Sequence, residues 1–220
     1  MDEVKKELPT YSVGEERFNY ISHLLGAIFG MFLLGYFNYL EVSKGFTPLE
    51  YISLLVYSLS MIVLYLTSFI YHFLRKDSPL KPIFRLLDHN TIYFLIAGTY
   101  FPVTVFALSR PSMIIAMSIE VICLIVGIIL NHLSFTNKWT KIITTIIYLV
   151  MGWIAIFFPD TYEIFPLSSF LFVLGGGVMY SIGVIFYVLG KKKKWFHSYF
   201  HLFVLFGTII QFVGIYILIK

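Results

Sequence analysis

Seven long apolar stretches constrain the fold of this 220-residue chain more than any other feature. A helix rises about 1.5 Å per residue, so roughly 20 apolar residues are needed to cross about 30 Å of hydrocarbon. The connections between the stretches are short, and 59% of the residues are hydrophobic. The sequence therefore predicts an all-α membrane protein, a single seven-transmembrane-helix bundle. The predicted spans lie at residues 18–40, 50–74, 91–108, 112–131, 140–158, 168–189 and 197–219.

The N-terminal segment differs in composition from the rest of the chain. Its sequence, MDEVKKELPTYSVGEER, mixes both signs of charge and contains no apolar core. It therefore lacks the features of a cleavable signal peptide. We predict two parts: a cytoplasmic N-terminal tail at residues 1–17 and a seven-transmembrane-helix domain at residues 18–220.

Basic residues are distributed unevenly between the two sides of the predicted bundle. Of the 16 Lys and Arg residues, only Lys44, Arg110 and Lys220 fall on the side opposite the N-terminal tail. Short loops rich in Lys and Arg stay in the cytoplasm. The pattern predicts a multi-pass protein of the plasma membrane with its N-terminus in the cytoplasm and its C-terminus outside. The net charge of +4 is explained in this way, and no nucleic-acid partner is predicted.

Two histidines enter the last apolar stretch at helical spacing. His197 and His201 are four residues apart, so their rings share one helix face about 6 Å apart along the axis. A divalent metal ion bridges such a pair when other elements supply further ligands. Histidines at helix ends also hydrogen-bond lipid headgroups or neighbouring carbonyl groups. The spacing alone leaves both interpretations open.

A third metal ligand would have to come from another predicted helix. Four histidines form the pool, since all six histidines fall toward the predicted cytoplasmic side; the pool consists of His23, His72, His89 and His132. Three imidazoles and a water at tetrahedral geometry form a zinc site of the catalytic type. Ser68 shares a helix face with His72, and Asp88 could orient or deprotonate the water. Spacing does not choose among the four histidines.

Five motifs together resemble a known family. They are EERFNYISHLLGAIFG (15–30), SFIYH (68–72), LDHNTIYFLIAGTYFP (87–102), GGGVMYSIGVIFY (175–187) and HSYFHLFVLFGTIIQF (197–212). In this order and on these helices they resemble the hemolysin III branch of the progestin and adipoQ receptor family. The likeness extends over nearly the whole chain.

The resemblance implies a particular metal site. By likeness to the receptors, Zn²⁺ would be held by His72, His197 and His201 on the cytoplasmic side, with Asp88 contacting the metal through water and Ser68 nearby. One position departs from the pattern. Gln211 stands where relatives often carry a further histidine, about 15 Å beyond His201 along the helix, so we do not expect it to bind the metal.

Other polar residues in the apolar stretches are further candidates. Glu16, Asn19 and His23 fit the opening motif of the family; they could form a polar network near the site or simply cap the first helix. His89 directly follows Asp88. Glu120 falls near the middle of the fourth stretch, where an acidic residue is costly and by default marks a functional site. It could equally be protonated against a neighbouring helix.

Three functions follow from these residues and from the resemblance. The first is a ceramidase-like hydrolase, in which a zinc-bound water attacks an amide or ester bond of a membrane lipid; membrane ceramidases are thought to be distant relatives of this family. The second is a receptor or regulator of membrane lipid state with a structural zinc. The third is a cytolytic pore, which the absence of a continuous charged stripe on any helix disfavours. A membrane lipid is the expected substrate or ligand, and the oligomeric state stays open.

Overall fold

The computed structural model describes residues 8–190 and 193–220, and this part of the chain is helical without a strand. Seven helices are long and apolar enough to cross a membrane, so the predicted all-α class and number of spans are confirmed. The helices are α2 (Val13–Lys44), α3 (Pro48–Phe73), α4 (Lys81–Ala107), α5 (Arg110–Ser134), α6 (Lys138–Trp153), α8 (Leu167–Gly190) and α9 (Phe196–Ile219). A 3-10 turn, η1 (Ile154–Phe157), extends α6, and a short helix, α7 (Asp160–Glu163), follows it. Residues 1–7 of the predicted tail lie outside the described part.

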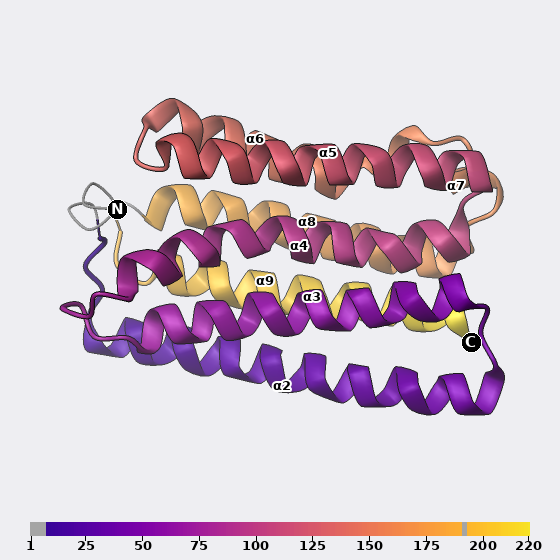
Figure 1. Cartoon of the computed structure of the whole chain (residues 1–220), viewed down its shortest axis with the longest axis horizontal. Helices are drawn as coiled ribbons and strands as arrows, with labels where there is room; N and C mark the ends of the chain where they lie inside the picture. Colours follow the sequence, from indigo (N-terminus) through magenta and orange to yellow (C-terminus); the bar gives the residue numbers. More distant parts are fainter. Residues whose placement is uncertain (1–7, 191–192) are drawn as a thin grey trace.

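The helices lie side by side along one long axis (Figure 1), and the first described residues and the C-terminus lie at opposite ends of it. α3 packs between α2 and α4, α8 packs along α9, and α5 and α6 cover α4. The end at which α3 finishes and α2, α4 and α9 begin carries most of the histidines. We call it the histidine end of the bundle.

The first helix begins five residues earlier than its apolar stretch. Ser12 and Glu15 form a capping box, in which the Ser12 hydroxyl accepts from the Glu15 N–H and the Glu15 carboxylate accepts from the Ser12 N–H. Helix α2 therefore starts at Val13, and Glu16 is already in its first turn. The polar turn that sequence analysis assigned to the tail is a part of the bundle.

Helices α8 and α9 approach each other closely through small residues. A Cβ atom at Gly176 would lie 2.2 Å from the Gln211 side chain and 2.8 Å from the Gly207 carbonyl oxygen. Any larger residue would force the two helices apart. The close packing fixes the height and rotation of α9, and with it the two histidines in its first two turns.

Candidate metal centre

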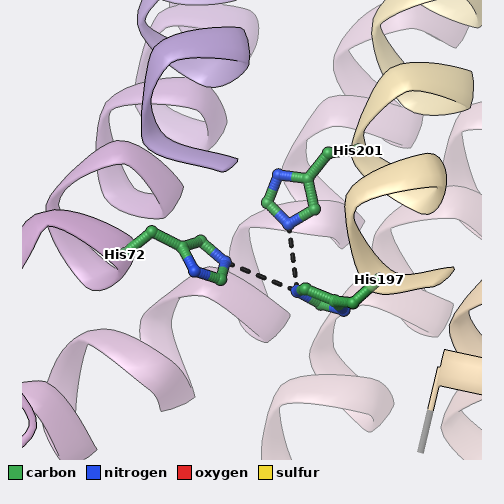
Figure 2. Close-up of side chains that lie close together, drawn as sticks. All are labelled: His72, His197 and His201. Carbon is green, nitrogen blue, oxygen red and sulfur yellow. Dashed lines mark hydrogen bonds between the residues drawn. The ribbon is translucent and has the colours of Figure 1, made fainter. Parts of the chain in front are cut away.

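Three histidines from two helices meet at the histidine end. His72 comes from the last turn of α3, and His197 and His201 come from the start of α9. Figure 2 shows the three rings pointing toward one another. The Nε2 atom of His197 lies 3.4 Å from Nε2 of His72 and 3.0 Å from Nε2 of His201. One ligand atom from each ring lies within 4.8 Å of the other two. We call these residues the histidine triad.

The triad has the geometry of a metal site. A zinc ion binds histidine nitrogen at about 2.0–2.1 Å, and tetrahedral ligands at that distance are about 3.3 Å apart. The observed separations of 3.0 and 3.4 Å are close to this value. His72 and His201 are almost fully buried. In the structure these nitrogens hydrogen-bond one another, and at the same spacing the triad could hold a metal ion.

Glu16 fixes the orientation of His72. Its carboxylate lies 2.6 Å from the His72 Nδ1 and 2.9 Å from the Lys81 ammonium. An Nδ1–H that donates to Glu16 leaves Nε2 of His72 as a lone-pair donor toward the triad centre. Carboxylates take this place behind many metal-binding histidines. The Asn19 amide also lies near, 3.4 Å from the same Nδ1 atom. The polar network proposed around Glu16 and Asn19 therefore exists, and it contacts a triad ligand.

Lys81 completes this network and was not a candidate in the sequence. Its side chain is only 3% exposed, and the ammonium also donates to the Leu74 carbonyl oxygen at 2.8 Å. The sequence placed it in a loop, ten residues before the predicted third span. Its contact with Glu16 joins positions 65 residues apart, and no local pattern reveals such a contact.

Aromatic rings cover the triad on two sides. Tyr11 stacks on the His197 ring with a centroid distance of 4.8 Å and an interplanar angle of 18°. His23 lies 3.8 Å from the His201 ring, so this predicted candidate packs against a triad member instead of joining the three ligand atoms. Burial raises the pKa of the Tyr11 hydroxyl well above its usual value. Tyr11 is thus a neutral cover over the site. Nothing in the sequence indicated this contact, because Tyr11 belongs to the polar segment predicted as a tail.

An apolar cavity opens beside the triad. His197 and His201 line it at one end, together with the predicted candidates Ser68, Asp88 and His89. The Ser68 hydroxyl is buried, and it interacts with the Asp88 carboxylate as a hydrogen-bond donor. Most of the remaining wall is aliphatic or aromatic. The cavity therefore combines a polar end at the histidines with an apolar interior.

Gln211 lines the cavity at the other end. Its position on α9, fourteen residues after His197, corresponds to about 21 Å along the axis. It is ten residues from His201, or about 15 Å along the helix, and that it does not bind a metal ion stays a prediction.

Two candidate residues from the sequence analysis, one glutamate and one histidine, lie apart from the triad. Glu120 is completely buried on α5, and neither carboxylate oxygen has a hydrogen-bond partner among the described residues. It does not line the cavity beside the triad. His132, one of the pool of possible ligands, is exposed near the end of α5. Of the pool, His72 is the histidine that the structure groups with His197 and His201, and Glu120 lies outside this group.

Comparison with known proteins gives a consistent family match. The sequence model of a family described as haemolysin-III related matches residues 11–212. The chain is 35% identical over 204 residues to Hemolysin-3 of Bacillus cereus, covering 92% of this chain and 91% of that protein. It is 30% identical over 203 residues to a Hemolysin-3 homolog of Bacillus subtilis (strain 168), covering 92% and 93% of the two chains.

Proposed function

Because this chain belongs to the haemolysin-III related family of membrane proteins, we propose that it is a zinc-dependent hydrolase of an amide or ester bond in a membrane lipid. One observation carries the proposal. Three buried histidines converge on a common point at the polar end of a largely apolar cavity that Ser68 and Asp88 also line. Such a cavity suits an acyl chain, and its polar end suits the bond to be cleaved.

The chemistry divides between the metal and the side chains around it. A zinc ion held by the triad would supply a water acidic enough to ionise near neutral pH and would polarise a carbonyl group. The Asp88 carboxylate accepts a proton from the attacking water and returns it to the leaving nitrogen or oxygen. The buried Ser68 hydroxyl, which lies beside Asp88, donates to the oxygen on which negative charge develops. Glu16 holds the His72 ring in place through Nδ1.

We place the site on the cytoplasmic side of the plasma membrane. The support comes from the sequence: the connections at the histidine end carry most of the Lys and Arg residues, and such segments stay in the cytoplasm. Substrate would then enter from the inner leaflet. Labelling of single introduced cysteines, near Ser78 at the histidine end and near Gly45 at the opposite end, in intact cells tests this orientation.

The experiment is a lipid hydrolysis assay on purified protein reconstituted with zinc. A panel of acyl amides and acyl esters, including ceramide, is incubated with the wild type and with Asp88→Asn. We expect the wild type to release fatty acid from at least one lipid, and Asp88→Asn to lose roughly 100-fold or more in rate while it keeps its zinc. If zinc-loaded wild type releases no fatty acid from any lipid in the panel, the hydrolase proposal fails.

A second candidate function treats the metal as structural. The triad joins the end of α3 to the start of α9, so a metal ion would crosslink these helices, as expected for a receptor or regulator of membrane lipid state. In this case zinc removal lowers the thermal stability sharply. The release of fatty acid stays at background level in both the wild type and Asp88→Asn. A cytolytic pore, which the names of the two Bacillus proteins suggest, is the third candidate. The apolar wall of the cavity disfavours it, and conductance in planar bilayers that a cavity substitution abolishes would support it.

A further inference from the structure

The cavity beside the triad has a polar residue deep in the bundle, far from the histidines. Helix α9 contributes His197, His201, Val204 and Gln211 to the cavity wall. Successive members of this set are four, three and seven residues apart, so they share one face of the helix. Gln211 is ten residues beyond His201, about 15 Å deeper in the bundle. An acyl chain that fills the cavity from the triad inward would therefore reach the Gln211 side chain.

The Gln211 amide is buried, and its carbonyl oxygen is unpaired. Only 5% of the residue is exposed. The oxygen has no hydrogen-bond partner within residues 8–190 and 193–220. Helix α8 packs tightly on the side chain, because a Cβ atom at Gly176 would lie 2.2 Å from the Gln211 Cγ. A buried amide without a partner costs free energy, and a ligand that supplies the partner would recover it.

The other polar side chains in this deeper part of the wall are bonded within the bundle. They come from α4, α6 and α8, and each has a partner in the protein. The bonded pairs are Thr99 with the Leu95 carbonyl oxygen, Tyr100 with the Gly152 carbonyl oxygen, Trp153 with Ser181, and Tyr180 with Thr208. Gln211 differs from these residues, because its amide is left to pair with a ligand.

We propose that Gln211 binds a hydroxyl group on the acyl chain of a lipid. A hydroxyl both donates and accepts, so it can pair with either end of the amide. A C–C bond of about 1.52 Å at an angle of about 111° advances a chain by about 1.25 Å, so about twelve carbons span 15 Å. The preferred chain therefore carries its hydroxyl near carbon 12 when its carbonyl group lies at the triad. A methyl group in the same place leaves the amide unpaired.

This inference rests on the proposed use of the cavity by an acyl chain, and it does not require hydrolysis. A free fatty acid, the product that the proposed hydrolase would release, is sufficient as a probe. A water molecule trapped beside Gln211 would have the same hydrogen-bonding chemistry as a hydroxyl of the ligand. The experiment therefore compares ligands with and without the hydroxyl, because a water would serve both equally.

The test is an equilibrium competition on the purified full chain, in which dodecanoic acid or 12-hydroxydodecanoic acid displaces a fluorescent fatty acid. Moving a hydroxyl out of water is itself costly, so the informative quantity is the ratio of the two affinities in each variant. Gln211→Met keeps the approximate shape of the side chain and removes the amide. We expect the affinity ratio of the hydroxylated to the plain acid to fall about tenfold in Gln211→Met, because one buried hydrogen bond is lost.

Two controls define the site. Thr99 lies eleven residues beyond Asp88, about 16 Å deeper on α4, and its hydroxyl is bonded to its own helix. Thr99→Val should therefore leave the affinity ratio at the wild-type value. The second control is 6-hydroxydodecanoic acid, whose hydroxyl lies half way along the chain. Its affinity relative to dodecanoic acid should be the same in the wild type and in Gln211→Met.

Gln211→Leu is a second variant without the amide, and it should give the same fall if Gln211→Met does not fold. An unchanged ratio in these variants, or an equal fall in Thr99→Val, would overturn the hydroxyl site while the acyl cavity stands. If neither acid displaces the probe, the proposed use of the cavity fails as well. A failed hydrolysis assay leaves these binding results untouched.

Discussion

Glu16 is not a member of the histidine triad, but removing its carboxylate should lower the zinc affinity because it contacts His72. The carboxylate contacts the His72 Nδ1 at 2.6 Å and the Lys81 ammonium at 2.9 Å. In Glu16→Ala, the His72 ring loses the acceptor that sets its tautomer and orientation. Loss of such a partner typically lowers metal affinity 10–100-fold, or about 1.4–2.7 kcal/mol. We expect the zinc affinity of Glu16→Ala to fall within this range.

The same substitution also affects folding stability through Lys81. Its side chain is 3% exposed, so the ammonium would stay buried with only the Leu74 carbonyl oxygen as a partner. Removing one member of a buried ion pair costs about 3–5 kcal/mol. Since the Glu16 side chain is 22% exposed, we expect a loss nearer about 2–3 kcal/mol. Glu16→Ala with Lys81→Met should recover much of the stability and none of the zinc affinity.

Two measurements separate the effects: chelator competition gives the zinc affinity, and thermal unfolding at saturating zinc gives the stability. Glu50→Ala is the matched control, because Glu50 completes a capping box with Thr47 at the other end of α3. It should lower stability by about 1 kcal/mol and leave zinc affinity unchanged. Wild-type zinc affinity in Glu16→Ala, or an equal loss of affinity in Glu50→Ala, would refute the argument.

Three other predictions concern individual contacts within the bundle. The pKa of Asp160 is lowered, chiefly by a hydrogen bond from the Ser109 side chain. The ionised Asp160 carboxylate therefore stabilises the fold above the unfolded pKa of about 3.9, and this stabilisation is lost as pH falls through the lower folded pKa. Asp160→Asn should remove this part of the dependence of the melting temperature on pH between 2 and 5, and an unchanged profile would contradict it. Tyr11→Ala should cost about 0.5–1.5 kcal/mol through the lost stacking on a triad imidazole, whereas Tyr11→Phe should melt like the wild type. Gly176→Ala should cost about 1–3 kcal/mol by forcing α8 from α9, and Gly35→Ala, which meets nothing within 4 Å, should be neutral or slightly stabilising in the same unfolding experiment.

Most of the fold was predictable, because hydrocarbon demands long apolar helices and the chain contains seven of them. The helix ends were less so. Helix α4 begins at Lys81, ten residues before the predicted span at 91–108. Its first turns mix apolar residues with Lys81, Arg85 and Asp88, and these charged residues interrupt the apolar pattern. Asp88, which precedes the predicted span, therefore lies two turns inside α4.

The candidate site was predictable only in part. The spacing of His197 and His201 identified a pair on one face, and resemblance to a family, not spacing, singled out His72. The structure brings these three together. Contacts with Lys81 and Tyr11 arise from chain segments far apart in sequence. Nothing local in the sequence marks such contacts, because they depend on how α2, α3, α4 and α9 pack.

Zinc content of the purified protein tests the central claim most directly. It is measured by inductively coupled plasma mass spectrometry on the wild type, on His197→Ala with His201→Ala, and on His132→Ala, which removes an exposed histidine on α5. We predict stoichiometric zinc in the wild type and in His132→Ala, and none in the double variant. Wild-type protein without zinc after growth and purification in its presence, or a double variant that keeps its zinc, would contradict the assignment of the triad as a metal centre.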